Sequence, residues 1–170
     1  MSRHRINIHF RKVDEIGIAA SRFVPIETRG AADFRAELAG LLTVTIASCY
    51  ENCVKDVLVN YAARRHTDFE MFSRNEFSRL NSKISVSDLY RVSQKFSPSI
   101  KENFKSLLQA RSEALVRRVG VDPREKYSQI LSWRHDYAHA GIKNTSLEEA
   151  LKFHSAAKRV LYCFDEAFNC

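Results

Sequence analysis

The reactive side chains of this 170-residue chain are densest between Trp133 and Gly141. The run places a cation, two imidazoles, a carboxylate and a phenol close together, as Arg134, His135, Asp136, Tyr137 and His139. Imidazole exchanges a proton near neutral pH, so it can serve as a general acid or base. The planar guanidinium group matches phosphate oxygens and stabilises the charge that builds in a transition state. These residue types together indicate acid–base chemistry on a phosphodiester.

Two other interpretations of the same residues stay open. His135 and His139 are four residues apart, a spacing found in helical zinc sites, but those sites place Glu directly after the first His. Asp136 occupies that position here, no third ligand is evident, and no metal is therefore expected. In a structural interpretation, Asp136 pairs with a neighbouring cation and the two histidines cap or pack.

The cluster lies near the end of a predicted helix. The run 122–125, Asp-Pro-Arg-Glu, supplies a capping residue, proline at the first helical position and Glu at the third. The helix is expected to stop at Gly141. In an ideal helix, residues five apart lie about 140° apart around the axis. Arg134 and His139 therefore share no face unless the helix loosens near Ala138 or a partner chain completes the site.

The strongest helical pattern in the chain precedes this cluster. From about Ala32 to Arg64, apolar side chains recur at threes and fours, and no proline interrupts them. The predicted apolar positions are Phe34, Leu38, Leu41, Leu42, Ile46, Cys49, Cys53, Val54, Val57, Leu58 and Tyr61. Residues 1–30 predict a short helix that ends before Pro25 and a loop at 25–30. One face of that helix would carry Phe10, Val13, Ile16 or Gly17, and Ala20.

Shorter helices joined by polar turns are predicted for residues 65–121. Ser85 or Ser87 would cap one of them, Pro98 would open another, and a third short element over 113–119 would stop before the next glycine. A capping box over 146–149 then opens the last helix. Its inner face would carry Leu147, Ala150, Leu151, His154, Ala157, Leu161, and Phe164 or Phe168.

The composition supports one all-α domain over residues 31–170, preceded by the N-terminal segment 1–30. The chain is 45% hydrophobic and 28% charged, and its 5 glycines and 3 prolines are few for a sandwich or barrel. The predicted fold is an up-and-down helical bundle with extra short helices. A net charge of +7 favours polyanionic partners such as nucleic acid.

The cysteines and the apolar runs bear on the compartment. Cys49, Cys53, Cys163 and Cys170 form no CxxC pair and are expected to be buried small hydrophobes in a reducing environment. No apolar run reaches the length of a membrane span, and the basic N-terminus lacks the apolar core of a secretory signal. The expected location is therefore the cytoplasm, without membrane association.

Two segments of the chain resemble the HEPN superfamily. Leu131-Ser-Trp-Arg134-His-Asp-Tyr-Ala-His139-Ala-Gly141 is similar to its Arg-x4-His signature. The upstream segment 46–58, Ile-Ala-Ser-Cys-Tyr-Glu-Asn-Cys-Val-Lys-Asp-Val-Leu, is similar to the long helix of the RiboL-PSP and MAE-type HEPN subfamilies, where an aromatic–Glu pair precedes an apolar run. The resemblance covers about residues 33–168.

The resemblance implies a homodimer whose two Arg-x4-His motifs face one cleft at the interface and cut RNA without a metal or other cofactor. Arg134 would bind the scissile phosphate, and His139 would act as general base or acid for attack by the 2′-hydroxyl, leaving a 2′,3′-cyclic phosphate. His135 would hold the phosphate or orient His139, and Glu51 would fix Arg134 through a charge-assisted pair. Lys143 is the nearest additional cation for RNA. Because a helix C-terminus favours imidazolium, the acid and base roles of His139 both stay open.

Three functional hypotheses follow. The first is an endoribonuclease that acts as a toxin or phage-defence effector and is restrained by an antitoxin or sensor partner. The second is a non-catalytic HEPN-like subunit that binds RNA or nucleotides within a larger complex. The third is a structural helical dimerisation domain, which predicts that Arg134 and His139 can both be replaced without consequence. Gly141 stands where related toxins carry a modifiable Tyr, so silencing by modification of such a Tyr is not expected.

Overall fold

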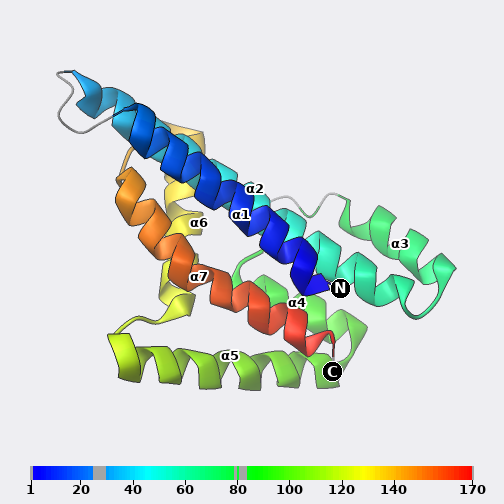
Figure 1. Ribbon diagram of the computed structural model, residues 1–170. Helices are drawn as coiled ribbons and strands as arrows, with labels where there is room; N and C mark the ends of the chain where they lie inside the picture. The colour runs from blue at the N-terminus through cyan, green and yellow to red at the C-terminus, as the bar shows by residue number, and fades with distance from the viewer. Residues whose placement is uncertain (1, 25–29, 79, 81–83, 170) are drawn as a thin grey trace.

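A computed structural model describes residues 2–24, 30–78, 80 and 84–169. Within these ranges the chain forms seven helices and no strand, so the all-α prediction is confirmed. Long helices pack lengthwise, and the shorter ones lie at the end of the molecule near both termini (Figure 1). The helices are α1 (Ser2–Phe23), α2 (Ala31–Ala63), α3 (Thr67–Phe77), α4 (Val86–Phe96), α5 (Pro98–Val119), α6 (Pro123–Ala140) and α7 (Leu147–Ala167).

Helix α2 is the centre of the fold. It packs against α1, α3, α6 and α7, while α5 lies across α7 and pairs with α4. Helices α1 and α2 run side by side in opposite directions, with α7 along them and α6 behind (Figure 1). This arrangement explains why α2 is buried around much of its circumference, including the small residues Ala39 and Ala47.

The core contains a column of rings contributed by four helices. Tyr50 stacks on Tyr127 with ring centroids 5.0 Å apart, and on the other side its hydroxyl lies 3.0 Å from Nδ1 of His154. Phe10 of α1 closes the column edge-on to His154, at 5.4 Å. The Tyr127 hydroxyl donates to the carbonyl of Ile84 at 2.8 Å, which satisfies its buried polar atom. The prediction that His154 is a packed histidine is confirmed.

Side-chain caps begin the helices where the sequence predicted them. Ser85 and Asp88 form a reciprocal capping box at the start of α4. Asp122 accepts from the backbone N–H of Arg124 ahead of α6, and Ser146 accepts from that of Glu149 ahead of α7. Each cap satisfies a backbone donor that lacks an intrahelical partner.

Three details of the predicted helices are corrected. The N-terminal helix is 22 residues long rather than short, and its core side carries Gly17 while Ile16 is 40% exposed, because the Leu151 side chain occupies the space beside the glycine. The separate element over 113–119 is wrong, since α5 continues unbroken to Val119. Phe34 and Leu41 were expected on the buried face of α2 and are instead 54% and 52% exposed.

The predicted burial of Cys49, Cys53 and Cys163 is confirmed, and all three are free thiols in the core. Cys170 and the predicted loop residues 25–29 lie outside the described residues. Burial raises the pKa of the Cys163 thiol and favours its neutral form. In the described ranges, no helix is apolar over a stretch long enough to cross a bilayer.

Candidate active site

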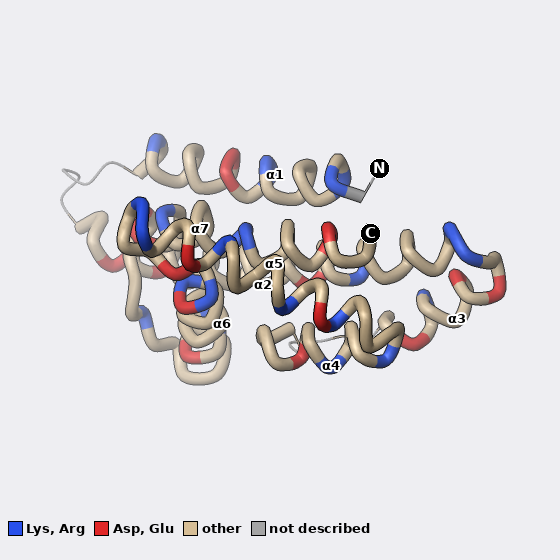
Figure 2. The backbone as a smooth tube through the Cα atoms, turned by 90° about the horizontal axis from the view of Figure 1, so that it is seen from below, with Lys and Arg blue, Asp and Glu red and all other residues tan. Residues whose placement is uncertain are grey.

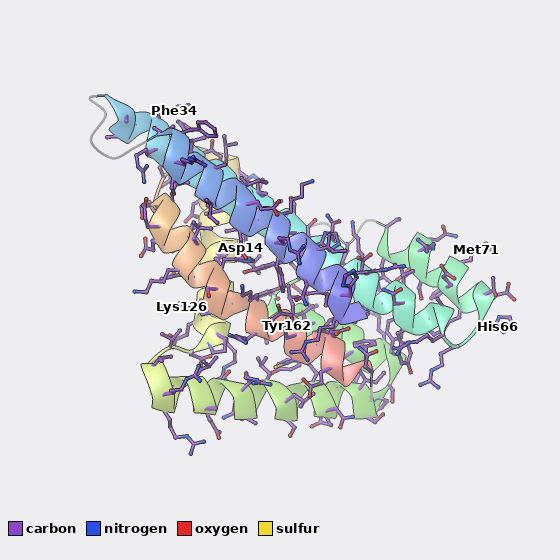
Figure 3. All side chains as sticks on the ribbon, viewed as in Figure 1. Asp14, Phe34, His66, Met71, Lys126 and Tyr162 are labelled. Carbon is purple, nitrogen blue, oxygen red and sulfur yellow. The ribbon has the colours of Figure 1, made fainter. Side chains whose placement is uncertain are left out.

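The Arg-x4-His cluster occupies the last two turns of α6, which is held against α7 by an aromatic contact. Trp133 is buried and stacks on Phe153 of α7, with ring centroids 4.8 Å apart. Lys126, two turns earlier on the same face of α6, places its ammonium 4.1 Å from the centre of the same Phe153 ring; Figure 3 marks its position beside α7. The Trp133 ring is therefore part of the core rather than of the exposed surface of the cluster.

A glycine lets the end of α6 approach α2 closely. A Cβ atom at Gly40 would lie 2.1 Å from Cδ2 of Tyr137, so the ring fits only because Gly40 has no side chain. The Tyr137 hydroxyl then donates to Oε2 of Glu37 at 2.9 Å, one turn earlier on α2. The contact fixes Tyr137, which lies between Arg134 and His139 in the chain.

Lys143 forms an ion pair with Oε1 of the same Glu37, which joins the loop after α6 to α2. Hydrogen bonds from Lys143 and from Tyr137 lower the pKa of the Glu37 carboxyl, and Glu37 in turn raises the pKa of Lys143. The predicted RNA-binding role of Lys143 stays a prediction, and an RNA phosphate would have to compete with Glu37 for this ammonium.

Helix α6 ends where the sequence predicted, at Gly141. This residue has φ 63°, and its backbone N–H donates to the carbonyl of Tyr137 at 3.0 Å. A left-handed residue after the last turn is a common helix ending, and glycine adopts it without steric penalty. In the loop that follows, the Asn144 amide donates to Asp136 at 3.3 Å. The end of the helix is therefore fixed by its backbone and by its loop.

The two histidines of the cluster share one exposed face. His135 and His139 are one turn apart on α6, with ring centroids 4.5 Å apart, and both are exposed. Helix α6 is continuous through Ala140, so the loosening near Ala138 that would bring Arg134 to His139 does not occur. Arg134 is half-buried and points about 140° around the axis from His139. Within one chain, the structure brings together the histidines but not the predicted catalytic pair.

Arg134 has no hydrogen bond or ion pair with any described residue. The same holds for the imidazoles of His135 and His139, whose rings contact each other. Glu51 is half-buried on α2. Burial raises the pKa of the Tyr127 phenol, and the nearby Glu51 charge adds to the same shift. The proposed pair between Glu51 and Arg134 is not among the contacts of Arg134. No set of three or more His, Cys, Asp and Glu side chains in the described ranges is placed to hold a metal ion.

Sequence reasoning missed the α2 residues that position the cluster. Glu37 and Gly40 are far from the motif in the chain, and neither belongs to a recognisable pattern. The available signal was a glycine inside a strongly helical segment, which destabilises a helix and is usually kept for close packing.

Comparison with known proteins gives one match. A family model described as RiboL-PSP-HEPN matches residues 18–169, which is nearly the whole chain and extends from the end of α1 to the end of α7. No curated protein and no solved structure matches the chain.

Proposed function

This chain belongs to the RiboL-PSP-HEPN family, and on that premise we propose that it is an endoribonuclease that cuts RNA without a metal ion. The observation that carries the proposal is the open end of α6. Its last two turns carry Arg134, which has no hydrogen bond or ion pair with a described residue, and two exposed imidazoles, His135 and His139, and this helix end is firmly held. A purely structural helix has no need for three basic groups without an acidic partner.

In the proposed reaction, the RNA 2′-hydroxyl attacks the adjacent phosphorus. The bond from O2′ to phosphorus forms as the bond from phosphorus to the 5′-oxygen breaks, leaving a 2′,3′-cyclic phosphate and a 5′-hydroxyl. One imidazole removes the 2′-hydroxyl proton and a second group protonates the leaving 5′-oxygen. Arg134 binds the non-bridging oxygens, whose negative charge grows in the transition state.

The separation of Arg134 and His139 around α6 supports a site completed by a second copy of the chain. Apolar side chains are exposed around the end of α6: Phe34 is 54%, Leu41 52% and Ile142 48% exposed. Phe34 projects outward at the start of α2 (Figure 3). Leu41 follows the glycine that contacts Tyr137, and Ile142 follows the residue that ends α6. We propose that these side chains form part of a homodimer interface beside the motif.

The decisive experiment is cleavage of end-labelled RNA by the purified protein in EDTA. The native chain should leave cyclic phosphate ends and should not cut DNA, which lacks the 2′-hydroxyl. His139→Ala and Arg134→Ala should each lower the rate by at least about 100-fold. His4→Ala and Arg5→Ala, which remove the same groups from an exposed part of α1, should leave it unchanged. Binding without cutting would favour the non-catalytic interpretation.

A role as a toxin or phage-defence effector is proposed from the family alone. Induced expression of the native chain should arrest bacterial growth, whereas His139→Ala, made to the same level, should not. Growth arrest by both would indicate a toxic effect unrelated to cleavage. If cells expressing either chain grow normally, although the native chain cleaves RNA in vitro, the toxin role would be contradicted.

A further inference from the structure

A hollow lined by arginines lies between α5 and α7, away from the Arg-x4-His cluster. Its volume is about 310 Å³, and it is lined by Arg111, Ala114, Leu115, Arg118 and Arg159. Three of these five residues carry a permanent positive charge, and no acidic residue in the described ranges lines the hollow. Arg111 and Arg118 are exposed and Arg159 is half-buried, and guanidinium groups gathered around one hollow repel one another unless an anion lies between them.

The helical register explains how the arginines converge. Arg111 and Arg118 are seven residues apart on α5, so they lie within about 20° of each other around the axis and about 10 Å apart along it. Arg159 approaches from α7, which packs on this side of α5. Basic positions recur along α5 when the molecule is viewed from below (Figure 2). The hollow is therefore made by two helices and cannot be recognised in either one alone.

The arginines are available to a ligand. Arg118 and Arg159 have no hydrogen bond or ion pair with a described residue. Arg111 is exposed, and its guanidinium acts to lower the pKa of the Cys163 thiol on α7, against the larger effect of burial, which places the two side chains near each other. On the neighbouring turns, the acidic residues Glu113 and Glu166 do not line the hollow, and Glu113 accepts a hydrogen bond from Gln109 at 2.6 Å.

The lining identifies the class of ligand. Guanidinium groups bind phosphate oxygens in a fork geometry, which an ammonium group cannot do. The remaining lining residues, Ala114 and Leu115, offer neither an aromatic ring for a base to stack on nor a polar group for a base edge. A site of this kind recognises phosphate and nothing else in a nucleotide, which is the character of a backbone contact that positions a strand without reading its sequence.

We propose that the arginine hollow binds the phosphate backbone of RNA at a second site, remote from the cleavage site. The inference rests on the proposed function for its choice of RNA as the ligand. Helix α6 begins beside the end of α5 and has 18 residues, so it is about 27 Å long. The histidines are at its far end. A strand held in the hollow is thus anchored well away from the bond that is cut, and long RNAs gain a contact that short ones cannot reach.

The test is binding of 2′-O-methyl RNA, which cannot be cut by 2′-hydroxyl attack, measured by fluorescence anisotropy. Arg118→Gln and Arg159→Gln should each weaken binding of a strand of about 20 nucleotides by about tenfold. Each should also reduce the dependence of log K on log salt by about 0.7. Arg117→Gln is the matched control, because it removes the same charge from the residue just before Arg118 on α5, which lies outside the hollow. Thermal melts should show that all three variants are folded.

The other outcomes are equally informative. Equal weakening by Arg117→Gln would show that net charge and not the hollow holds RNA, which would overturn the proposal. So would unchanged binding by both hollow variants. If inorganic phosphate or a nucleoside triphosphate raises the melting temperature of the native chain but not of Arg118→Gln, while RNA binding is unaffected, the hollow is a small-anion site instead. Cleavage of a short RNA is measured separately, so a failure of the nuclease proposal remains distinguishable from a failure of this one.

Discussion

Single side chains at the end of α6 determine how the proposed catalytic groups are presented. Tyr137 lies between Arg134 and His139 and is fixed from α2 by a glycine and a carboxylate. A change at these supporting positions therefore acts on the cluster without removing any of its reactive atoms.

Gly40→Ala tests this contact with opposite expectations from sequence and structure. In a helix interior, replacing Gly by Ala normally stabilises by about 1 kcal/mol. Here the new methyl group overlaps the Tyr137 ring, so we expect a net destabilisation of about 1–3 kcal/mol and slower cleavage. The measurement is urea unfolding.

The same substitution in a Tyr137→Ala background supplies the control. With the ring absent, Gly40→Ala should recover its ordinary stabilising effect, and the two changes should be strongly non-additive. Additive effects would show that the α2–α6 contact at this position is not the cause.

At the scale of elements, the ending of α6 matters more than the equivalent ending of α5. Gly120 and Gly141 both adopt a left-handed conformation, with φ 67° and 63°, and neither is crowded by neighbouring atoms. Either residue changed to Ala should therefore destabilise by about 1 kcal/mol through backbone strain alone. Only Gly141→Ala loosens the turn that carries His139.

Comparison of these two variants separates stability from function. We expect equal losses in melting temperature, with RNA cleavage reduced in Gly141→Ala and retained in Gly120→Ala. An equal loss of cleavage in both would show that global stability, rather than the local ending of α6, limits the activity.

The meeting of α1, α2 and α7 makes stability depend on pH. His154 is fully buried beside Tyr50 and Phe10, and its Nε2 has no hydrogen-bond partner in the described part of the chain. Burial, reinforced by the nearby Lys158 ammonium, lowers the pKa of His154 from 6.5 to about 3. The carboxylate of Asp14, 3.9 Å from Nε2, does not offset the burial.

The folded state therefore holds His154 neutral, while the unfolded state protonates it below pH 6.5. The contribution of the neutral histidine is complete above pH 6.5 and should fall by about 1.4 kcal/mol per pH unit as the pH decreases toward 3. Chemical unfolding between pH 7.5 and 5 measures this slope. His154→Phe, which keeps a ring in the column, should reduce this slope by the amount due to one proton. An unchanged slope would contradict the assignment.

The elements themselves were largely predictable, because their signals are local. Caps such as Asp122 and Ser146 act within a few residues of their own backbone. The extent of α5 was not predictable in the same way, since its polar middle carries a weak apolar pattern, and packing on α4 and α7 decides its length. The exposure of Phe34 and Leu41 also escaped prediction, because an apolar face left for a partner has the same periodicity as one buried in the core.

The candidate site was predictable only in part, for the same physical reason. Arg134, His135 and His139 are close in sequence, so their types and spacing suffice to select them. The groups that hold them, and the arginines of the hollow, come from helices far apart in the chain. Their proximity depends on how α2 meets α6 and on how α5 meets α7, which no short segment encodes.

At the scale of the whole molecule, subunit mixing tests whether the site is shared between two copies. Arg134→Ala and His139→Ala should each be inactive alone. If Arg134 of one copy works with His139 of the other, unfolding and refolding the two together should restore up to about a quarter of the native rate, because half of the dimers are mixed and each has one intact pair. Light scattering should show dimers that Leu41→Glu disrupts. No recovery despite mixed dimers would place the working pair within one chain.

The α6–α7 contact has one more consequence, which is optical. Trp133 is the single tryptophan of the chain, it is buried against Phe153, and Arg134 directly follows it. All tryptophan emission thus originates at the base of the proposed active site, and it is free of background from other indoles. The intrinsic fluorescence of the unlabelled protein should therefore change when the α6–α7 contact opens or when a nucleobase binds beside the motif.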